Sequence, residues 1–493
     1  MTSGSAAPAA GVQGTAGPGF IKAMSLTDAT MLVAGTMIGS GIFIVSADMA
    51  RLLGSPFLLL LAWFLTAVMT LLGALAYGEM AAMYPRAGGL YVFLREAMGP
   101  LMGFLYGWTL FVVIQTGTIA AVGVAFGKFL GLLVPAIGPE LFTWLPHAEV
   151  RTSGALLELG LSPQRLVALL SIWVLTWINL RGVKEGKFVQ TTLTVVKTAA
   201  IAVLIILAVT IGRKADVIAV NFGTGFFGPG VFGADGFSGA FVVVFGAAMV
   251  GSLFAADAWH GVTSAAAEVQ DPTRNLPRSL VLGAGLVMLL YFLVNVAYLS
   301  VLPFEGVQHA SLDRVGTAAA EAIFGTVGST LMALAILVST FGCNNGLILS
   351  GARVYWAMAK DGLFFRPAAA LNRAGVPAWA LIAQAAWTSV LCLTGTYTQL
   401  LDYVIFAALI FYVLTTIGLF ILRVKRPDVH RPYRAIGYPV LPALYIAMAA
   451  AVAIILLVAD KTRPQALSGL VVVLVGVPVY FLTRHTVAAE ATT

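Results

Sequence analysis

The sequence predicts an all-α polytopic membrane protein, and three features support this prediction. The chain of 493 residues is 60% hydrophobic and only 10% charged, which is too little charge for the surface of a soluble protein of this length. Its apolar residues gather in runs of about 20 residues or more, the length of helix that crosses a hydrocarbon core of about 30 Å. The runs show no regular alternation of apolar and polar residues, so a β-barrel is not expected.

We expect about 12 transmembrane helices from these runs. They lie near residues 26–52, 56–84, 100–134, 164–181, 188–211, 238–267, 279–303, 327–356, 377–394, 399–423, 439–459 and 466–484. Segment 311–326 is expected to form a short helix on the outer surface.

A single transmembrane domain, residues 24–484, is expected between two short cytoplasmic tails, with no soluble domain. Residues 1–23 are predicted to be disordered, because their start is small and polar and has neither the charged beginning nor the apolar core of a signal peptide. Residues 485–493 form the expected C-terminal tail.

The positive charge of the chain is explained by membrane topology rather than by a nucleic-acid partner. The net charge is +7, and 18 of the 28 lysines and arginines fall on the side that holds both termini, against nine on the other side. This bias follows the positive-inside rule and predicts cytoplasmic termini. A bacterial inner membrane is the expected location.

The first predicted span is interrupted by GTMIGSGIF, residues 35–43. Its glycines, Gly35, Gly39 and Gly41, each weaken a helix by about 1 kcal/mol relative to alanine. Unwound backbone is tolerated at membrane depth only where it faces a cavity that holds water or a ligand. The alternative is that the small residues serve close helix packing.

A second interruption, GSLFAADAWHGVT at residues 251–263, favours a binding site over simple packing. It places two ionisable residues, Asp257 and His260, in an apolar segment. Spans one and six are thus broken at matching positions of two five-helix halves, about 26–211 and 238–423. This pattern is typical of inverted-repeat transporters, whose site lies where the breaks meet. Half-helix N–H groups attract an anion and half-helix carbonyls a cation, so the pair suits a zwitterion such as an α-amino acid.

GTMIGSGIF resembles the first-helix signature of the amino acid–polyamine–organocation (APC) superfamily, and further stretches resemble its L-type amino acid transporter branch. These stretches are YGEMAAMYPRAGGLYVFLREAMGP (77–100), NLRGVKEGKFVQ (179–190), AAEVQDPTRNLPRSL (266–280), NGLILSGARVYWAMAKDGLF (345–364) and LRVKRPDVHRPYRAIGYPVLP (422–442). The resemblance covers nearly all of residues 24–484. It implies a five-plus-five inverted repeat (LeuT-like) followed by two extra helices, about 439–484, and transport by alternating access.

The resemblance also implies site residues. The implied substrate-binding residues are Met37, Gly39, Ser40, Gly41, Phe254, Ala255 and Asp257. The N–H groups of Ser40 and Gly41 would meet the substrate carboxylate, and carbonyls of the other segments would meet its ammonium group. The candidates for gating or coupling are Lys197, Phe254, Trp259 and His260. Phe254 resembles the aromatic residue that closes the site from outside, and core packing is its alternative role.

Lys197 lies in the middle of the fifth predicted span, where a lysine costs about 2.5–3.5 kcal/mol and therefore needs partners. It matches a lysine of sodium-independent relatives whose ammonium group stands where sodium-coupled relatives hold a sodium ion. It would join span five to the carbonyls of the first break and to span eight. Proton coupling is an open alternative, and a snorkelling lysine near the span end is the structural one.

Asp257 and Ala408 point toward different substrates. Asp257 could pair with a cationic side chain, with the ligand ammonium, or with unwound backbone. Ala408 occupies a position that is polar in several relatives and favours apolar substrates. Ala258 stands where relatives more often have glycine, which weakens the expected unwinding of span six. His260, one turn beyond Asp257, could relay protons or could be a neutral hydrogen-bonded residue.

Other classes of protein are disfavoured. The five histidines are dispersed, and no nucleophile–base arrangement or metal-ligand spacing is found, so neither an enzyme nor a metal or other cofactor is expected. A channel is disfavoured because no filter-like repeat is present. Cys343 and Cys392 fall in spans, and loop 135–163 has no cysteine. A disulfide-linked partner subunit, as some relatives have, is therefore not expected. We expect a monomer or a weak homo-oligomer.

The sequence thus predicts a sodium-independent transporter of L-amino acids in the lipid bilayer, most simply an exchanger of neutral ones. Facilitated diffusion and proton symport remain alternatives to exchange. Cationic amino acids bound through Asp257 are the second substrate class, and polyamines are the third.

Overall fold

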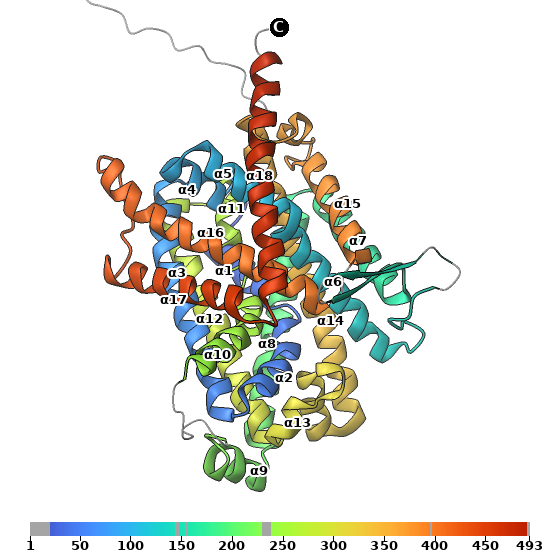
Figure 1. Ribbon diagram of the computed structural model, residues 1–493. Coiled ribbons are helices and arrows are strands. Elements are labelled where there is room, and N and C mark those ends of the chain that lie inside the picture. Colours follow the sequence, from blue (N-terminus) through green and yellow to red (C-terminus); the bar gives the residue numbers. More distant parts are fainter. Residues whose placement is uncertain are drawn as a thin grey trace, which may run out of the picture.

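The computed structural model describes residues 20–142, 145, 147–152, 155–228, 238–394 and 397–490, and most of them are helical (Figure 1). In chain order the longer helices are α1 (Leu26–Met37), α2 (Gly41–Leu53), α3 (Pro56–Met83), α4 (Leu90–Met98), α5 (Pro100–Thr109), α6 (Gln115–Leu133), α7 (Pro163–Arg181), α8 (Val183–Thr210), α10 (Gly239–Ala255), α12 (Pro272–Val301), α14 (Val315–Lys360), α15 (Ala378–Thr394), α16 (Tyr397–Lys425), α17 (Val440–Val458) and α18 (Arg463–Glu490). The short elements are η1 (Leu110–Ile114), α9 (Ala215–Ala219), η2 (Val220–Thr224), α11 (Gly261–Ser264), η3 (Ala266–Glu268), α13 (Phe304–Gln308), η4 (Ser311–Asp313) and η5 (Arg366–Ala369), together with the strands β1 (Ala148–Thr152) and β2 (Ala155–Leu159).

The described part of the chain contains nine continuous helices that are long and apolar enough to cross a membrane. The pair α1 and α2 makes a tenth crossing, bent by 41° at its break. Large apolar side chains are exposed on several of these helices, including Ile206 of α8, Leu331 of α14 and Ile454 of α17. Such faces are stable against lipid tails and not against water, so the molecule is a multi-pass membrane protein.

Local sequence explains where the first helices begin. Ser25 caps α1 by accepting a hydrogen bond from the N–H of Asp28, whose carboxylate in turn accepts the N–H of Ser25 at 2.9 Å. Ser55 caps α3 in the same way from its hydroxyl, and Pro56 follows at the first helical position, where its missing N–H is not needed. Gly54, with φ of 65°, ends α2 in the left-handed conformation that glycine adopts without strain.

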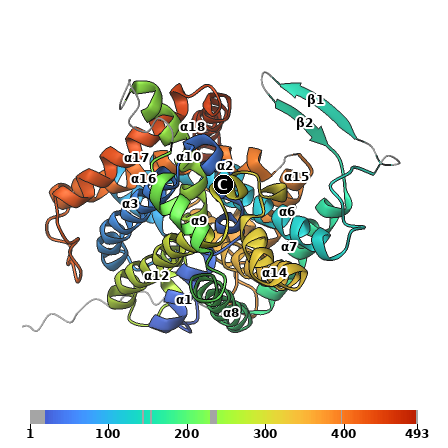
Figure 2. The same cartoon turned by 90° about the horizontal axis from the view of Figure 1, so that it is seen from below.

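The outer loop 135–163, which the all-α prediction left without secondary structure, contains two short strands. Strands β1 and β2 pair there as an antiparallel hairpin, in which Ala148 faces Leu159 and Thr152 faces Ala155. Figure 2 shows the hairpin projecting sideways from the helical bundle. The sequence reading missed it because two strands of five residues give a weak pattern beside so many long apolar runs.

The structure also describes parts of the two predicted tails. Residues 1–19 of the predicted disordered tail lie outside the described residues, but Phe20 packs edge-on against Trp356 and Ala23 accepts a hydrogen bond from Lys187. At the other end, α18 continues to Glu490, inside the predicted C-terminal tail. The expected outer helix at 311–326 is found as the start of α14, separated from the rest by a kink at Gly325.

Helices α2 and α10 lie against each other, and α1 packs on α12 and α8. Helix α14 passes beside α6, α8 and α1. The arrangement brings the end of α1, the start of α2 and the end of α10 together inside the bundle.

Candidate functional site

The first predicted break is present between α1 and α2. Helix α1 ends at Met37, Ile38 is extended with ψ of 90°, and α2 begins at Gly41. The first N–H groups of α2 have no acceptors within their own helix, and the helix dipole makes this end electropositive. The sequence-predicted residues Gly39, Ser40 and Gly41 therefore lie at a helix start that suits a carboxylate.

Two glycines of the break are required by close approach. A Cβ atom added at Gly41 would lie 2.7 Å from the Cβ of Ala255, at the end of α10. A Cβ added at Gly35 would lie 2.1 Å from Nε2 of Gln190 and 2.2 Å from Oγ1 of Thr194, both on α8. The glycines therefore serve both proposed roles of this motif: they allow close helix packing, and they lie where the helix unwinds.

Side chains of other helices satisfy the carbonyl groups that the break frees. The Tyr291 hydroxyl of α12 donates to the Met37 carbonyl at 2.9 Å, and the Cys343 thiol of α14 donates to the Thr36 carbonyl at 3.0 Å. The Ser339 hydroxyl of α14 donates to the Ile38 and Gly39 carbonyls at 3.1 and 3.0 Å. Buried carbonyl groups need hydrogen-bond donors, so these side chains stabilise the unwound backbone.

Lys197 of α8 contacts the first break, as the family resemblance implies. Its side chain is 1% exposed, and Nζ donates to the carbonyls of Gly35 at 2.5 Å, Ile38 at 2.6 Å and Ser339 at 3.3 Å. The ammonium group therefore connects span five, the first break and α14. This burial and these partners exclude a snorkelling lysine.

The second predicted break is also present, and it forms with an alanine, Ala258, at the turn. Helix α10 ends at Ala255, residues 256–260 form a turn, and the chain becomes helical again at Gly261. Ala258 takes a φ of 65°, a left-handed conformation that alanine adopts only with strain. The Thr36 hydroxyl of α1 donates to the Ala258 carbonyl at 3.2 Å, which ties the two breaks together.

Asp257 and His260 do not share a helix face, because the backbone between them is not helical. Tyr412 of α16 joins them instead. Its hydroxyl donates to Oδ1 of Asp257 and lies 2.7 Å from Nε2 of His260. All three side chains are buried, at 8%, 6% and 6% exposure for Asp257, Tyr412 and His260. The result is a buried polar chain between α10, α11 and α16, which we call the Asp257–Tyr412–His260 relay.

Two small cavities lie on either side of Asp257. The first, which we call the break cavity, is lined by Thr36, Met37, Gly39, Ser40, Gly41, Thr118, Val122, Phe254, Ala255, Asp257, Ala258 and Cys343. The second, which we call the rear cavity, is lined by Met69, Thr70, Leu253, Ala256, Asp257, Trp259, Ile405, Ala408, Leu409, Tyr412 and Tyr445. All seven predicted substrate-binding residues therefore surround the break cavity, and Asp257 alone among them also lines the rear one.

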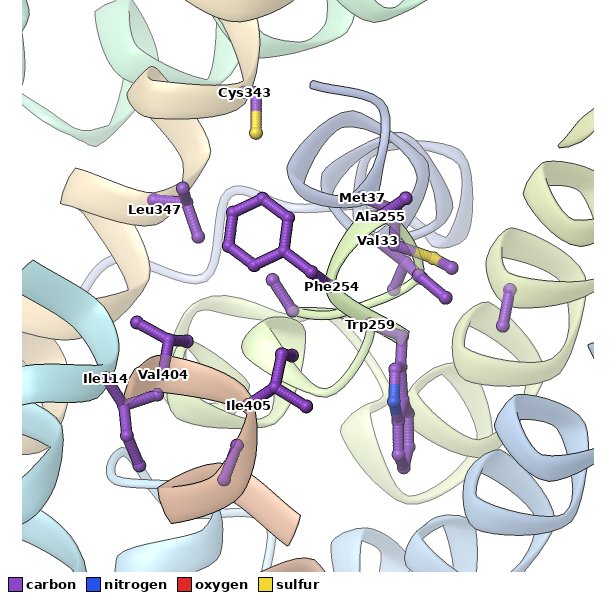
Figure 3. Close-up of a cluster of buried hydrophobic side chains, with 14 of the residues drawn as sticks. Val33, Met37, Ile114, Phe254, Ala255, Trp259, Cys343, Leu347, Val404 and Ile405 are labelled. Atoms are coloured by element: carbon purple, nitrogen blue, oxygen red, sulfur yellow. The ribbon is translucent and has the colours of Figure 1, made fainter. Parts of the chain in front are cut away.

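Figure 3 shows the aromatic candidates Phe254 and Trp259 projecting in different directions. The Phe254 ring projects from the end of α10 toward Leu347 of α14, above Val404 and Ile405 of α16. Trp259 projects to the other side of the turn, where its ring lies 4.8 Å from that of Tyr77. Phe254 thus lies at the break cavity, as a gate would, while Trp259 packs into the wall of the rear cavity.

Two buried carboxylates form ion pairs with arginines. Glu79 is fully buried and accepts hydrogen bonds from Arg423 at 3.0 and 2.6 Å. Glu268 accepts one from Arg353 at 2.9 Å, and both of these side chains are buried. The Glu79–Arg423 pair holds α3 to α16. The Glu268–Arg353 pair holds the segment after α11 to α14.

The sequence reading missed the donors that complete the site. Tyr291, Ser339, Cys343 and Tyr412 are polar residues of three long apolar helices, and nothing in the local sequence distinguishes them from polar neighbours such as Thr340 or Thr415. Their only common signal is a position at membrane depth, where a polar side chain needs a partner. Which partner each one meets depends on the packing of distant helices.

Residues 24–478 of the chain match the sequence model of a family described as "Amino acid permease". The chain belongs to the amino acid permease family. It is therefore a membrane transporter and not an enzyme.

Amino acid transporters are similar to it over most of their length. The chain is 31% identical over 466 residues to the "Serine/threonine exchanger SteT" of Bacillus subtilis (strain 168), covering 94% of this chain and 97% of that one. It is 28% identical over 480 residues to the human "Large neutral amino acids transporter small subunit 2", covering 97% and 83%. It is 27% identical over 466 residues to the mouse "Asc-type amino acid transporter 1", covering 94% and 81%.

Proposed function

We propose that this permease is a sodium-independent exchanger of neutral L-amino acids that works by alternating access. One observation carries the proposal: the start of α2 and the end of α10 both line the break cavity. The α2 start offers N–H groups to a carboxylate, and the carbonyls at the α10 end and the Asp257 carboxylate suit an ammonium group. A bound α-amino acid would thus hold its backbone at the breaks.

The neutral preference is supported by the rear cavity. Apart from Asp257, its walls are mainly apolar or aromatic, and Ala408 adds no polar group to them. The Asp257 carboxylate already accepts the Tyr412 hydroxyl, which leaves it less available to a second cation. The names of the bacterial exchanger and the human neutral amino acid transporter point in the same direction.

Independence from sodium is supported by Lys197. Its ammonium group donates to the Gly35 and Ile38 carbonyls. By the family resemblance, this is where sodium-coupled relatives hold the ion. A sodium ion at that position would compete with a covalently attached cation, so no sodium requirement is expected.

The same proposal includes the full architecture. Helices α10 and α15, apolar and 17 residues each, are short for a span, and counting them with the other ten crossings gives twelve. The breaks then fall in spans one and six of a five-plus-five inverted repeat, with α17 and α18 as the extra helices. We place both termini in the cytoplasm and the protein in the inner membrane, on the charge bias of the loops.

A stand-alone carrier is proposed, as a monomer or weak homo-oligomer. Both cysteines, Cys343 and Cys392, are free and buried. Neither could reach a partner subunit to form a disulfide bond.

A second candidate function, transport of cationic amino acids, rests on Asp257. This carboxylate lines both cavities, so a long substrate side chain that entered the rear cavity would place its positive charge near it. Breaking the Tyr412 hydrogen bond would be the energetic cost of such binding.

Exchange in liposomes tests these proposals. Purified protein is reconstituted in liposomes preloaded with one amino acid at a time, and labelled uptake is followed at two pH values with and without sodium. Internal serine or another neutral amino acid should accelerate uptake severalfold, and sodium should have no effect. Stimulation by sodium would exclude the role given to Lys197. Uptake that is indifferent to internal substrate would exclude exchange. Selective loss of arginine or lysine uptake in Asp257→Asn would instead support the second candidate.

A further inference from the structure

Helices α3 and α12 lie next to each other, as Figures 1 and 2 both show. A wide cleft opens beside them. It is separate from the break cavity and the rear cavity. Its lining residues come from α1, α3, α12 and the segment before α17: Leu26, Leu75, Thr273, Arg274, Pro277, Arg278, Val281, Leu282, Pro432, Tyr433 and Ile436. We call it the α3–α12 cleft.

One end of the cleft carries positive charge that the protein does not neutralise. Arg274 and Arg278 lie one turn apart on α12, and both are exposed. Within the described residues neither forms an ion pair, although Asp271 lies close in sequence. The neighbouring arginines differ, because Arg423 and Arg431 both reach the carboxylate of Glu79.

The other end of the cleft is apolar and continues into the lipid-facing surface of α12. Leu26, Leu75 and Val281 form part of its wall, and Leu282 is 54% exposed. Farther along α12 an exposed leucine, Leu289, extends the apolar strip. A ligand that satisfies both ends needs an anionic group and long hydrocarbon chains.

We propose that the α3–α12 cleft binds one anionic phospholipid. Its phosphate lies between Arg274 and Arg278, and its acyl chains lie along Val281 and Leu282. The arginines fall on the side with the excess of lysine and arginine, so the lipid belongs to the leaflet on that side. The chain's own N-terminal segment is a poor alternative occupant, because residues 1–19 contain no aspartate or glutamate.

The test measures binding of fluorescent phosphatidylglycerol to the full-length protein in a neutral detergent, with phosphatidylcholine as competitor. Removing two arginine contacts should weaken binding of phosphatidylglycerol about tenfold or more in Arg274→Gln/Arg278→Gln. The matched control is Lys425→Gln/Arg426→Gln, which removes two exposed charges at the end of α16, outside the cleft. The control should bind as the unaltered protein does.

Further arms keep the proposal falsifiable. Ile436, which is 60% exposed at the cleft, can be changed to glutamate with little risk to folding, and Ile436→Glu should also weaken binding. Equal loss in both double variants, or equal binding of phosphatidylcholine, would overturn the proposal. So would full displacement by inorganic phosphate, which would indicate a soluble anion site. Lipid binding is measured without amino acids, so its failure leaves the proposed transport function untouched.

Discussion

The two broken helices reach similar shapes by different chemistry. The α1–α2 break depends on glycines, whose missing side chains allow close packing: Gly41 lets α2 approach Ala255. Donors from other helices satisfy the carbonyl groups of the break. The break after α10 contains no glycine between Ala255 and His260, and Ala258 takes a left-handed conformation instead. The first break is therefore marked by glycines in the local sequence, whereas the second has no such mark, and hydrogen bonds from other helices stabilise both. Four predictions test this difference, in order of decreasing effect.

The largest effect is expected at Lys197, the central donor of the first break. Lys197→Met leaves the Gly35 carbonyl without the donor it has now and removes one of the donors to Ile38. Each lost partner costs about 1–3 kcal/mol, so exchange in liposomes should fall about a hundredfold. Lys187→Met is the control on the same helix, because Lys187 is partly exposed and pairs with Asp28. Normal exchange by Lys197→Met would show that the first break does not depend on this donor.

A smaller loss is expected at Gly41, where the two breaks touch. In Gly41→Ala the new Cβ would lie 2.7 Å from that of Ala255, so α2 and α10 must separate. Overpacking of this kind costs about 1–3 kcal/mol, and we expect about a tenfold lower exchange rate. Gly285→Ala on α12 is the matched control, because its added Cβ would meet Leu71 at an ordinary 3.7 Å. If both variants exchange equally well, close approach at Gly41 is not essential.

The second break should be more sensitive to the relay than to its own backbone. Tyr412→Phe removes the hydroxyl that joins Asp257 to His260. Loss of such hydrogen bonds costs about 1 kcal/mol, so uptake should change about fivefold, with a larger relative change for arginine than for serine. Tyr445→Phe is the control, since Tyr445 lines the same cavity outside the relay. Equal changes for both substrates would mean that Tyr412 does not control access to Asp257.

The smallest effect is expected at Ala258. Ala258→Gly removes left-handed strain of about 1 kcal/mol, part of which the greater freedom of glycine in the unfolded chain offsets. The net gain in stability should be about 0.5 kcal/mol, seen as a slightly higher melting temperature of the purified protein. Ala256→Gly, at an ordinary φ of −85°, should lower the melting temperature instead. A lower melting temperature for Ala258→Gly would mean that the strain is not significant.

Much of the fold could be predicted because the bilayer imposes simple requirements on sequence. Each predicted span coincides with a helix or pair of helices, since an apolar run of this length has few other stable structures in lipid. The hairpin of β1 and β2 could not be predicted, because the bilayer places no such requirement on loops. The position of Lys197 beneath the first break was predicted through the family resemblance, and the need of a buried lysine for partners agrees with it.

The sequence by itself determined the membrane class, the approximate spans and the site of the first break, and its family resemblance indicated seven of the residues around the break cavity. Only the tertiary structure decided that Tyr412 links Asp257 to His260, that Tyr291 and Ser339 serve the freed carbonyls, and that span six unwinds at an alanine. The physical reason is the separation in sequence over which each effect acts. Hydrophobicity and glycine content act within one helix, whereas a buried hydrogen bond pairs side chains far apart in sequence, and its partner is fixed only when the helices pack.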